Sequence, residues 1–298
     1  MSADVALFPG FAPQRVRTSG AEIHCVVGGA GPPLLLLHGY PQTHAMWHKV
    51  APALAESFTV VCADLRGYGD SSRPASDDSH AVYSKRAMAL DMVELMRALG
   101  FARFRLAGHD RGGRVAHRLA ADHPQAVEQV AVLDISPTRI MYGRTDMAFA
   151  RAYYHWFFLI QPFDLPERMI GADPDFYLRR KLGGWGSDAT HFDPRALAEY
   201  RRCFADAATI HATCEDYRAA ASIDLVHDDA DVAATRKLTC PLLVLWGEKG
   251  VVHRLFTPLA DWAEVATDVR GRALPSGHYL AEEAPEPTVA ELAAFFAA

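Results

Sequence analysis

The sequence predicts an α/β fold with a mostly parallel central sheet flanked by helices, and three observations predict it. Several short apolar runs have the length and composition of strands and end in glycine or polar turn residues. Runs such as LLLL and LLVLW have no polar alternation, which is typical of strands buried on both faces of a parallel sheet. Helix-like segments lie between most of these runs, and this alternation indicates right-handed crossovers.

The predicted elements follow one another along the first 135 residues. The strand-like runs are, in order, EIHCVVGG (22–29), PLLLLHG (33–39), FTVVCADLRG (58–67), FRLAGHD (104–110) and VEQVAVLDI (127–135). The segments 84–100 and 113–124 have helix-like patterns and lie on either side of the run at 104–110. This part of the chain therefore predicts a parallel sheet whose strands are joined by helices.

The alternation stops between about residues 140 and 232. This stretch is rich in Tyr, Trp, Phe, Arg and His, contains the helix-like pieces 146–160 and 193–204, and offers no convincing strand. The sheet then resumes at CPLLVLWGE (240–248), continues through GRALPSGHYL, and is followed by the helix-like segment 286–298. We therefore predict a core domain of residues 1–140 and 233–298, with residues 141–232 as a helical cap.

Composition and charge narrow the range of functions. The chain has 298 residues, half of them hydrophobic, which is enough for one large core domain with an insertion. The formal net charge is -6 and there is no run of like charges, so we expect no nucleic-acid partner. An anionic substrate would be mildly repelled by the whole molecule, so a site for it must be built locally.

The cysteines and the apolar runs indicate the compartment. The five cysteines are odd in number, scattered and without C-x-x-C spacing, which predicts neither a disulfide framework nor a zinc site. The first residues do not form a basic flank leading into an apolar segment, and no apolar run approaches about 18 residues. We expect a soluble cytoplasmic protein that has no membrane partner.

The stretch LAGHDRGGRVAHRLA (106–120) contains the most informative motif. Gly108-His109-Asp110-Arg111-Gly112 has the G-x-x-x-G spacing of a nucleophile elbow, the sharp turn from strand to helix that exposes one side chain. The exposed residue is usually serine, and here it is Asp110. The alternative is that Asp110 is an ordinary turn residue. An elbow with no hydroxyl or thiol argues against a serine-type esterase.

A carboxylate at an elbow has a definite chemistry. The N-terminus of the following helix favours an anion, so Asp110 should be ionised and should need no base to act as a nucleophile. Attack on an sp3 carbon gives an ester that water must hydrolyse. Downstream lie Asp134 and His278, in the order nucleophile, acid, histidine of the α/β-hydrolase fold. His278 would take a proton from water while Asp134 fixes its tautomer.

Hydrolysis of this ester also needs an oxyanion hole. The segment LHGYP (37–41) follows an early strand, where such folds place the loop that forms the hole. The candidate donors are therefore the backbone N–H groups of Tyr40 and Arg111.

Arg111 and Arg114 lie three residues apart beside Asp110 and share a helix face. One interpretation is an ordinary surface pair between Asp110 and Arg114, which would contribute only about 0.3 to 0.5 kcal/mol. The other is a fork for a substrate carboxylate, because arginine offers planar bidentate donors. Two negative charges 4 Å apart repel by about 1 kcal/mol in water and about 4 kcal/mol at an effective dielectric constant of 20. A carboxylate nucleophile that attacks an anionic substrate therefore needs such cations.

Several motifs together resemble the fluoroacetate dehalogenases, over nearly the whole chain. They are GHDRGGR, LLLLHGYPQTHAMW, ADLRGYGDSSRP, LDISPT, YYHWFFL, CEDYRAA and SGHYLAEEAP. The set is specific, because haloalkane dehalogenases and epoxide hydrolases usually have tryptophan where Arg111 stands. The resemblance implies an α/β-hydrolase fold, Asp110 as the nucleophile, and Asp134 with His278 as the residues that activate water. It also implies that Arg111 and Arg114 hold the substrate carboxylate.

The resemblance further implies a halide pocket on the cap, matched here by His155, Trp156 and Tyr217. Their N–H and O–H donors would stabilise a leaving fluoride, on which compact charge develops. Packing of an aromatic helix face on the core remains the alternative for YYHWFF. We expect a haloacetate substrate and neither a metal nor an organic cofactor. The resemblance also implies a homodimer.

Two rival functions stay open. An epoxide hydrolase would use cap tyrosines such as Tyr154 or Tyr217 as donors to the epoxide oxygen, and the paired arginines would restrict it to a carboxylated epoxide. A non-catalytic ligand-binding protein of the same fold could do without a complete set of Asp110, Asp134 and His278.

Overall fold

A computed structural model describes residues 7–184 and 190–298. Its centre is an eight-stranded sheet with the strand order β1-β2-β4-β3-β5-β6-β7-β8. The strands from β4 to β8 in this order are parallel, and β1 and β2 add an antiparallel edge. The predicted mostly parallel sheet is confirmed. The strand bounds are β1 Ala12–Arg17, β2 Glu22–Gly28, β3 Pro33–Leu37, β4 Thr59–Ala63, β5 Phe104–His109, β6 Val127–Leu133, β7 Leu242–Gly247 and β8 Val269–Leu274.

Each strand-like run in the sequence forms a strand, and the unbroken apolar runs lie at the centre of the sheet. Leu34, Leu35, Leu36 and Leu37 of β3 are all buried, because helices cover both faces of this strand. The strand β1 is not anticipated by the sequence analysis. Its residues are nearly all exposed, so its sequence carries no apolar periodicity.

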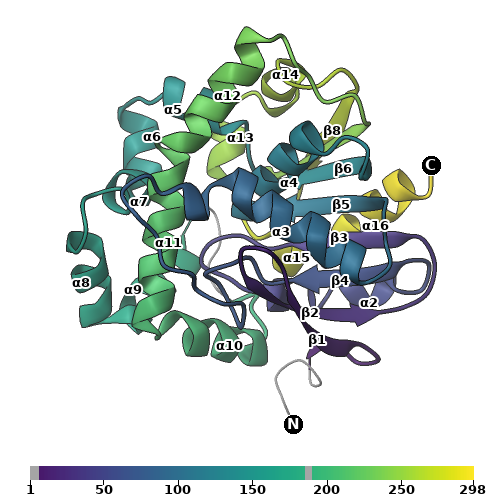
Figure 1. Cartoon of the computed structure of the whole chain (residues 1–298), viewed down its shortest axis with the longest axis horizontal. Helices are drawn as coiled ribbons and strands as arrows, with labels where there is room; N and C mark the ends of the chain where they lie inside the picture. The colour runs from purple at the N-terminus through teal and green to yellow at the C-terminus, as the bar shows by residue number, and fades with distance from the viewer. Residues whose placement is uncertain (1–6, 185–189) are drawn as a thin grey trace.

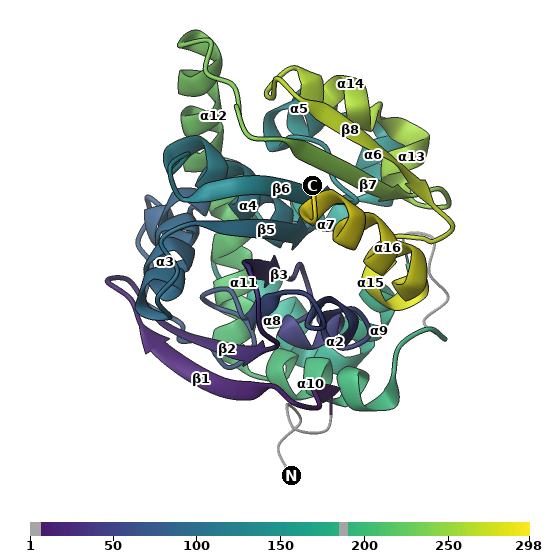
Figure 2. The same ribbon diagram turned by 90° about the vertical axis from the view of Figure 1, so that its right-hand side faces the viewer.

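Helices of the core lie on both faces of the sheet, as Figure 2 shows with α3 on one side and α16 on the other. The predicted helices at 84–100 and 113–124 are α3 and α4, and α4 begins two residues earlier than predicted. The bounds of the core helices are α2 Ala51–Leu54, α3 Lys85–Ala98, α4 Arg111–Asp122, α13 Val251–Leu255, α14 Pro258–Ala263, α15 Leu280–Glu283 and α16 Pro285–Phe296, with 3-10 turns at His44–Trp47 and Ala81–Tyr83.

A helical insertion separates β6 from β7. Figure 1 shows most of its helices gathered beside the sheet, on the left of the view. Within the described parts of 134–241 no strand occurs, as predicted, although residues 185–189 lie outside the described chain. The helix bounds are α5 Thr138–Gly143, α6 Met147–Ala152, α7 Tyr154–Phe158, α8 Leu165–Ala172, α9 Pro174–Leu182, α10 Pro194–Phe204, α11 Ala207–Ala220 and α12 Ile223–Ala233.

The helix-like piece 146–160 differs from the expectation in one respect. It forms two short helices, α6 and α7, that meet at Tyr153. The backbone of Tyr153 leaves helical geometry there, with φ -113° and ψ 39°. The bend turns the second half of the piece, which contains His155 and Trp156, into a separate element.

The register of the parallel strands brings the carboxyl ends of β3, β5 and β6 together. Leu37 pairs with Gly108, and His109 pairs with Leu133. The residues that follow, Asp110 and Asp134, therefore emerge at the same edge of the sheet. This edge is where ligands bind in open α/β sheets.

No helix within residues 7–184 and 190–298 is long and apolar enough to span a membrane. All five cysteines are free, and four of them are buried.

Candidate active site

The turn from β5 into α4 has the geometry of an elbow. Asp110 occupies it with φ 47° and ψ -113°, a backbone conformation that costs energy for a residue with a side chain. The turn also requires close backbone approach. A Cβ atom on Gly108 would lie 2.4 Å from the carbonyl oxygen of Gly112, and one on Gly112 would lie 2.4 Å from that of His38. These contacts explain the small residues of the motif and show that the chain holds Asp110 in a strained, fixed position.

The carboxylate of Asp110 is buried and receives a backbone donor. The N–H of Tyr40 donates to Asp110 Oδ1 at 2.9 Å. Burial alone would raise the pKa of Asp110, but the charges of His278, His109 and the two arginines outweigh it, and the pKa is lowered. Asp110 is therefore ionised at neutral pH. The N–H of Tyr40 belongs to the loop at residues 37–41, which thus lies where an oxyanion donor was predicted. Arg111 is the first residue of α4, so its N–H has no partner within the helix.

His278 and Asp134 form a buried pair. His278 Nδ1 lies 2.6 Å from Asp134 Oδ2, and the N–H of Gly247 donates to Asp134 Oδ1 at 2.9 Å. Burial tends to lower the pKa of His278, but the hydrogen bond and the charge of Asp134, with a contribution from Asp110, raise it overall. The hydrogen bond assigns the Nδ1 proton toward Asp134, so Nε2 is the nitrogen that can act as a base. The structure thus brings all three predicted catalytic residues to one edge of the sheet.

Arg111 is completely buried, and its guanidinium is already engaged. Its Nε and Nη2 donate to the carboxylate of Asp216 at 3.0 and 2.6 Å, and Nη2 also donates to the backbone oxygen of Asp216 at 2.9 Å. Asp216 therefore occupies the Nε and Nη2 edge of Arg111, so a substrate carboxylate cannot bind that edge. Among the described residues, Nη1 of Arg111 has no hydrogen-bond partner. One N–H-bearing nitrogen of Arg111 is thus left for an anion.

Arg114 is engaged in a similar way. Its Nη1 donates to Thr138 Oγ1 at 2.8 Å and to the backbone oxygen of Ser136 at 3.2 Å, and Nη2 contacts Met141 Sδ at 3.2 Å. Its Nε is buried and lacks a partner within the described chain. Since Asp110 and Arg114 are both buried, the interpretation as an ordinary surface pair is wrong. Each arginine contributes one unsatisfied buried donor, and a buried cation with a spare donor favours an anionic ligand.

The three predicted halide ligands lie together and close to these arginines. The ring centres of His155 and Tyr217 are 5.6 Å apart, and those of Trp156 and Tyr217 are 6.4 Å apart. The guanidinium carbon of Arg111 is 4.1 Å from the ring centre of Tyr217, and that of Arg114 is 4.7 Å from the ring centre of Trp156. These rings pack on the core, as the alternative interpretation of YYHWFF requires, and they also adjoin the charged site.

The protonation states of these residues suit hydrogen-bond donation. Burial lowers the pKa of His155 well below its usual value, so its ring is neutral at neutral pH and carries one N–H. Burial, assisted by the charge of Asp110, raises the pKa of Tyr217 well above its usual value, so the phenol keeps its proton. The Tyr217 hydroxyl is buried and has no partner among the described residues. A ligand with strong acceptor character would satisfy it.

The sequence analysis missed three residues of this site. Asp216 precedes Tyr217 in the quoted motif CEDYRAA, and a carboxylate inside a buried helix is the signal that could have paired it with an arginine. Lys85 contacts the same carboxylate from 131 residues away, a separation that no local pattern reveals. His109 Nε2 lies 2.8 Å from the backbone oxygen of His278 and thus links the end of β5 to the loop that carries His278.

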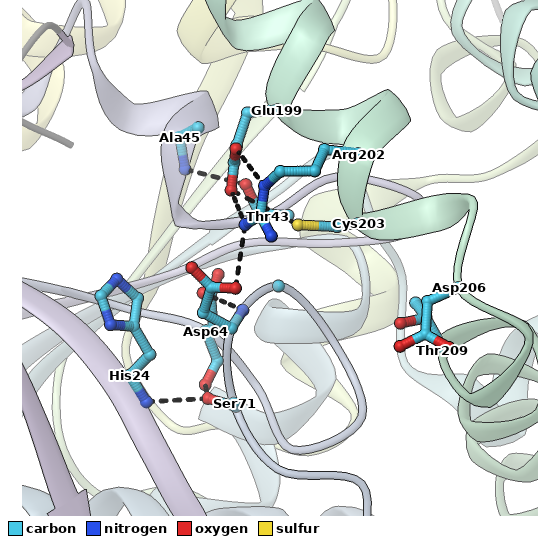
Figure 3. Close-up of polar contacts among 12 residues, drawn as sticks. His24, Thr43, Ala45, Asp64, Ser71, Glu199, Arg202, Cys203, Asp206 and Thr209 are labelled. Atoms are coloured by element: carbon cyan, nitrogen blue, oxygen red, sulfur yellow. Dashed lines mark hydrogen bonds and ion pairs between the residues drawn. The ribbon is translucent and has the colours of Figure 1, made fainter. Parts of the chain in front are cut away.

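A second cluster of potential ligand residues lies apart from this chemistry. Atoms of His24, His44 and Asp64 that could bind a metal lie within 4.8 Å of one another. Asp64 already accepts hydrogen bonds from the N–H groups of His44 and Asp70 at 2.8 and 2.9 Å. Figure 3 shows Ser71 between the backbone of His24 and that of Asp64. These bonds hold β2 against the loop after β4, which is a structural role.

The same loop holds the insertion in place. Arg202 of α10, seen beside Glu199 in Figure 3, donates to Asp70 Oδ1 at 2.9 Å. Arg73 Nε donates to Thr209 Oγ1 of α11 at 2.7 Å. Helix α11, which supplies Asp216 and Tyr217, is therefore fixed relative to the core.

A cavity of about 410 Å³ lies between α4, α12 and the segment before β7, lined by residues such as His117, Ile140 and Leu238. None of the predicted site residues lines it, so it is not the place where the chemistry described above would occur.

Comparison with known proteins agrees with this geometry. The family model for the alpha/beta hydrolase fold matches residues 32–285, which is most of the chain. The chain belongs to the alpha/beta hydrolase fold family. Within this family it is 51% identical over 290 residues to a fluoroacetate dehalogenase from Burkholderia sp, covering 97% of this chain and 95% of the relative.

Two further relatives place the chain within the alpha/beta hydrolase fold family. A soluble epoxide hydrolase from Corynebacterium sp. (strain C12) is 37% identical, over 94% of this chain and 95% of the relative. The solved structure of a proposed alpha/beta hydrolase from Nostoc sp PCC 7120 is 60% identical and superimposes with a TM-score of 0.95, covering 97% of this chain and 99% of that chain. The higher identity to the dehalogenase than to the epoxide hydrolase favours carbon-halide chemistry.

Proposed function

We propose that this alpha/beta hydrolase removes halide from haloacetates, converting fluoroacetate to glycolate and fluoride through an ester on Asp110. The observation that carries the proposal is an ionised elbow carboxylate beside two buried arginines that each retain an unsatisfied donor. A neutral substrate would leave these two donors unsatisfied, at a cost of about 1 to 3 kcal/mol each. The identity to the fluoroacetate dehalogenase supports the same substrate class.

In the first step Asp110 attacks the carbon that bears the halogen. Because Oδ1 accepts the N–H of Tyr40, Oδ2 is the attacking oxygen. Nη1 of Arg111 and Nε of Arg114 hold the substrate carboxylate and offset the repulsion between two anions. The C–O bond forms as the C–F bond breaks, and the fluoride leaves with the bonding electrons. The N–H groups of His155 and Trp156 and the hydroxyl of Tyr217 stabilise it as its charge develops.

In the second step water cleaves the ester. His278 Nε2 takes a proton from water while Asp134 stabilises the imidazolium that forms. The hydroxide equivalent attacks Cγ of Asp110, and the backbone N–H groups of Tyr40 and Arg111 stabilise the oxyanion at Oδ1. The imidazolium then returns its proton to the departing glycolate oxygen. Asp110 is left as a carboxylic acid and becomes an ionised carboxylate again when the second proton of the water is released to solvent. This mechanism uses protein groups alone and requires no cofactor.

The proposal extends to the organisation of the molecule. Residues 141–232 act as a cap that supplies the halide donors, and residues 1–140 and 233–298 form the core with the catalytic residues; residues 1–6 and 185–189 of these ranges lie outside the described chain. The enzyme works in the cytoplasm, where its five free thiols stay reduced. It forms a homodimer. The exposed apolar side chains on the cap surface support this proposal, and they belong to Phe163, Met169 and Phe176. Size-exclusion chromatography with light scattering tests the dimer.

Halide release by the purified protein tests the function. Fluoroacetate and chloroacetate are supplied in parallel, halide is followed with ion-selective electrodes, and Asp110→Asn is the control. The proposal expects release of both halides by the wild-type protein and loss of both in the variant. Chloride without fluoride would keep the mechanism but reject fluoroacetate as a substrate. Release of neither halide would reject the proposal and favour hydrolysis of a carboxylated epoxide, with Tyr217 as donor to the epoxide oxygen.

A further inference from the structure

A buried cluster of charges joins the cap to the core behind Arg111. Asp216 of α11 binds Arg111 of α4 through Nε and Nη2. The same carboxylate accepts hydrogen bonds from Lys85 Nζ of α3 and, at 2.6 Å, from the hydroxyl of Tyr68. Every one of these four side chains is buried. One cap carboxylate therefore gathers three donors from three separate parts of the core.

This arrangement fixes the orientation of the Arg111 guanidinium. Asp216 holds two of its three nitrogens through three hydrogen bonds, and the ring of the next residue, Tyr217, covers one face of the plane. The remaining nitrogen, Nη1, is the one without a partner among the described residues. Because a guanidinium is rigid and planar, fixing two nitrogens fixes the third.

The cluster also sets the net positive charge that is available to a substrate anion. A carboxylate bound to Arg111 would cancel the positive charge that a substrate anion needs, since buried opposite charges at 2.6 Å neutralise each other's field. Lys85 lies against the same carboxylate, so Arg111, Lys85 and Asp216 together keep one net positive charge. Asp224 lies 3.4 Å from Lys85 Nζ, and burial raises the pKa of this second carboxyl group.

We propose that Asp216 and Lys85 are positioning residues for carboxylate recognition, Asp216 by aiming Nη1 of Arg111 at the substrate and Lys85 by restoring the positive charge that Asp216 would otherwise cancel. The inference rests on the proposed function for the identity of the substrate. Anion recognition then depends on Asp216, a cap residue that does not touch the substrate. The anion site is therefore complete only when the cap is packed correctly on the core.

Calorimetric titration with glycolate, the expected product, tests the inference without any turnover. Its neutral analogue glycolamide is titrated in parallel, and thermal unfolding verifies that each variant is folded. Lys85→Met removes the charge and keeps the length of the side chain. We expect glycolate to bind about tenfold more weakly to this variant, with glycolamide unchanged. Unchanged glycolate affinity, or equal weakening of both ligands, would overturn the role of Lys85.

A double variant separates the orientation of the Arg111 guanidinium from the net charge of the cluster. Lys85→Met combined with Asp216→Asn leaves the net charge of the cluster unaltered but removes the ionic anchor of Arg111. If Asp216 aims Arg111, glycolate binds about fivefold or more weakly to the double variant, whereas wild-type affinity would overturn this part. Tyr68→Phe is the milder variant if these do not fold, because it removes one hydrogen bond to Asp216. It should weaken glycolate binding about threefold, and an unchanged affinity would count against the inference.

The outcome is independent of dehalogenation. Halide release with unaltered glycolate affinities in the variants would keep the proposed function and reject the roles of Asp216 and Lys85. Glycolate binding that depends on Lys85, in a protein that releases no halide, would keep the role of Lys85 and reject the proposed function.

Discussion

His278 Nδ1 and Asp134 Oδ2 lie 2.6 Å apart in a buried pair, although 144 residues separate them in the chain. Asp134 is in turn held by the N–H of Gly247, so the acceptor cannot rotate away from the ring. This relationship orients the imidazole and keeps Nε2 as its basic nitrogen. It also divides the proposed reaction into a step that does not need His278 and a step that does.

Replacing His278 should therefore stop the reaction half-way. In His278→Asn the carboxylate of Asp110 can still attack, but no base activates water. We expect a rapid release of about one halide per active site, then a steady rate lower by on the order of 10³-fold. Intact-protein mass spectrometry should detect the ester on the peptide that contains Asp110. Absence of both the burst and the adduct would mean that His278 is needed for the first step.

The pH dependence of turnover follows from the same pair. Burial opposes protonation of His278, but Asp134 outweighs it, so the pKa of His278 lies above its ordinary value of 6.5. The base must be neutral, so kcat should increase with pH and level off above that pKa. The pKa of Asp110 is lowered, so the nucleophile stays ionised over the same range. A kcat profile measured from about pH 5 to about pH 9 that inflects below pH 6.5, or that decreases with pH, would contradict this assignment.

Tyr217→Phe should affect fluoride more than chloride. The variant keeps the ring on Arg111 and removes the hydroxyl, which has no partner among the described residues. Fluoride is the more compact leaving group and depends more on donors, so we expect kcat for fluoroacetate to decrease about tenfold or more. Chloroacetate serves as the internal control and should lose much less. An equal loss with both substrates would indicate general damage to the site.

A stability prediction concerns Glu282 of α15, which contacts helix α10 of the insertion. It accepts hydrogen bonds from Gln42 Nε2 at 2.5 Å and from the Tyr200 hydroxyl at 3.1 Å, and burial raises its pKa to about 8. The folded protein therefore keeps a proton that the unfolded chain loses near 4.5, the ordinary pKa of a glutamate side chain. This contribution to stability is complete below pH 4.5 and is lost as the pH increases through about 8.

Glu282→Gln mimics the protonated form and should remove that pH dependence. We expect its Tm to exceed that of the wild-type protein at alkaline pH and to approach it at acidic pH. Glu286→Gln, an exposed position on α16, is the control and should follow the wild-type curve. Parallel Tm curves for Glu282→Gln and the wild-type protein would show that Glu282 is ionised in the folded state.

The sequence predicted the parts of the fold that have periodic or motif signals. The unbroken apolar runs correctly predicted the central strands, and the elbow motif located Asp110 because only small residues allow its turn. The edge strand β1 was missed because its exposed residues have no apolar pattern. Asp134 and His278 could be proposed from their order in the chain, since parallel strands bring their carboxyl ends together.

The state of the arginines could not be predicted in the same way. Residue type indicated an anion site at Arg111, but the occupation of its fork by Asp216 depends on how α11 packs over α4. Lys85 lies at the start of α3 and reaches the same carboxylate only in the folded chain. Such long-range ion pairs follow from tertiary packing, which a single sequence without local periodicity does not specify.

Single-turnover hydrolysis in water labelled with oxygen-18 tests the covalent mechanism most directly. With enzyme in excess over fluoroacetate, water attacks Cγ of Asp110, so the label should enter the carboxylate of Asp110 while the released glycolate carries the original aspartate oxygen. Mass spectrometry of the peptide that contains Asp110 and of the glycolate measures both. Label on Asp110 and unlabelled glycolate is the result that the account predicts. Labelled glycolate with an unlabelled Asp110 would mean that water attacks the substrate directly and would contradict it.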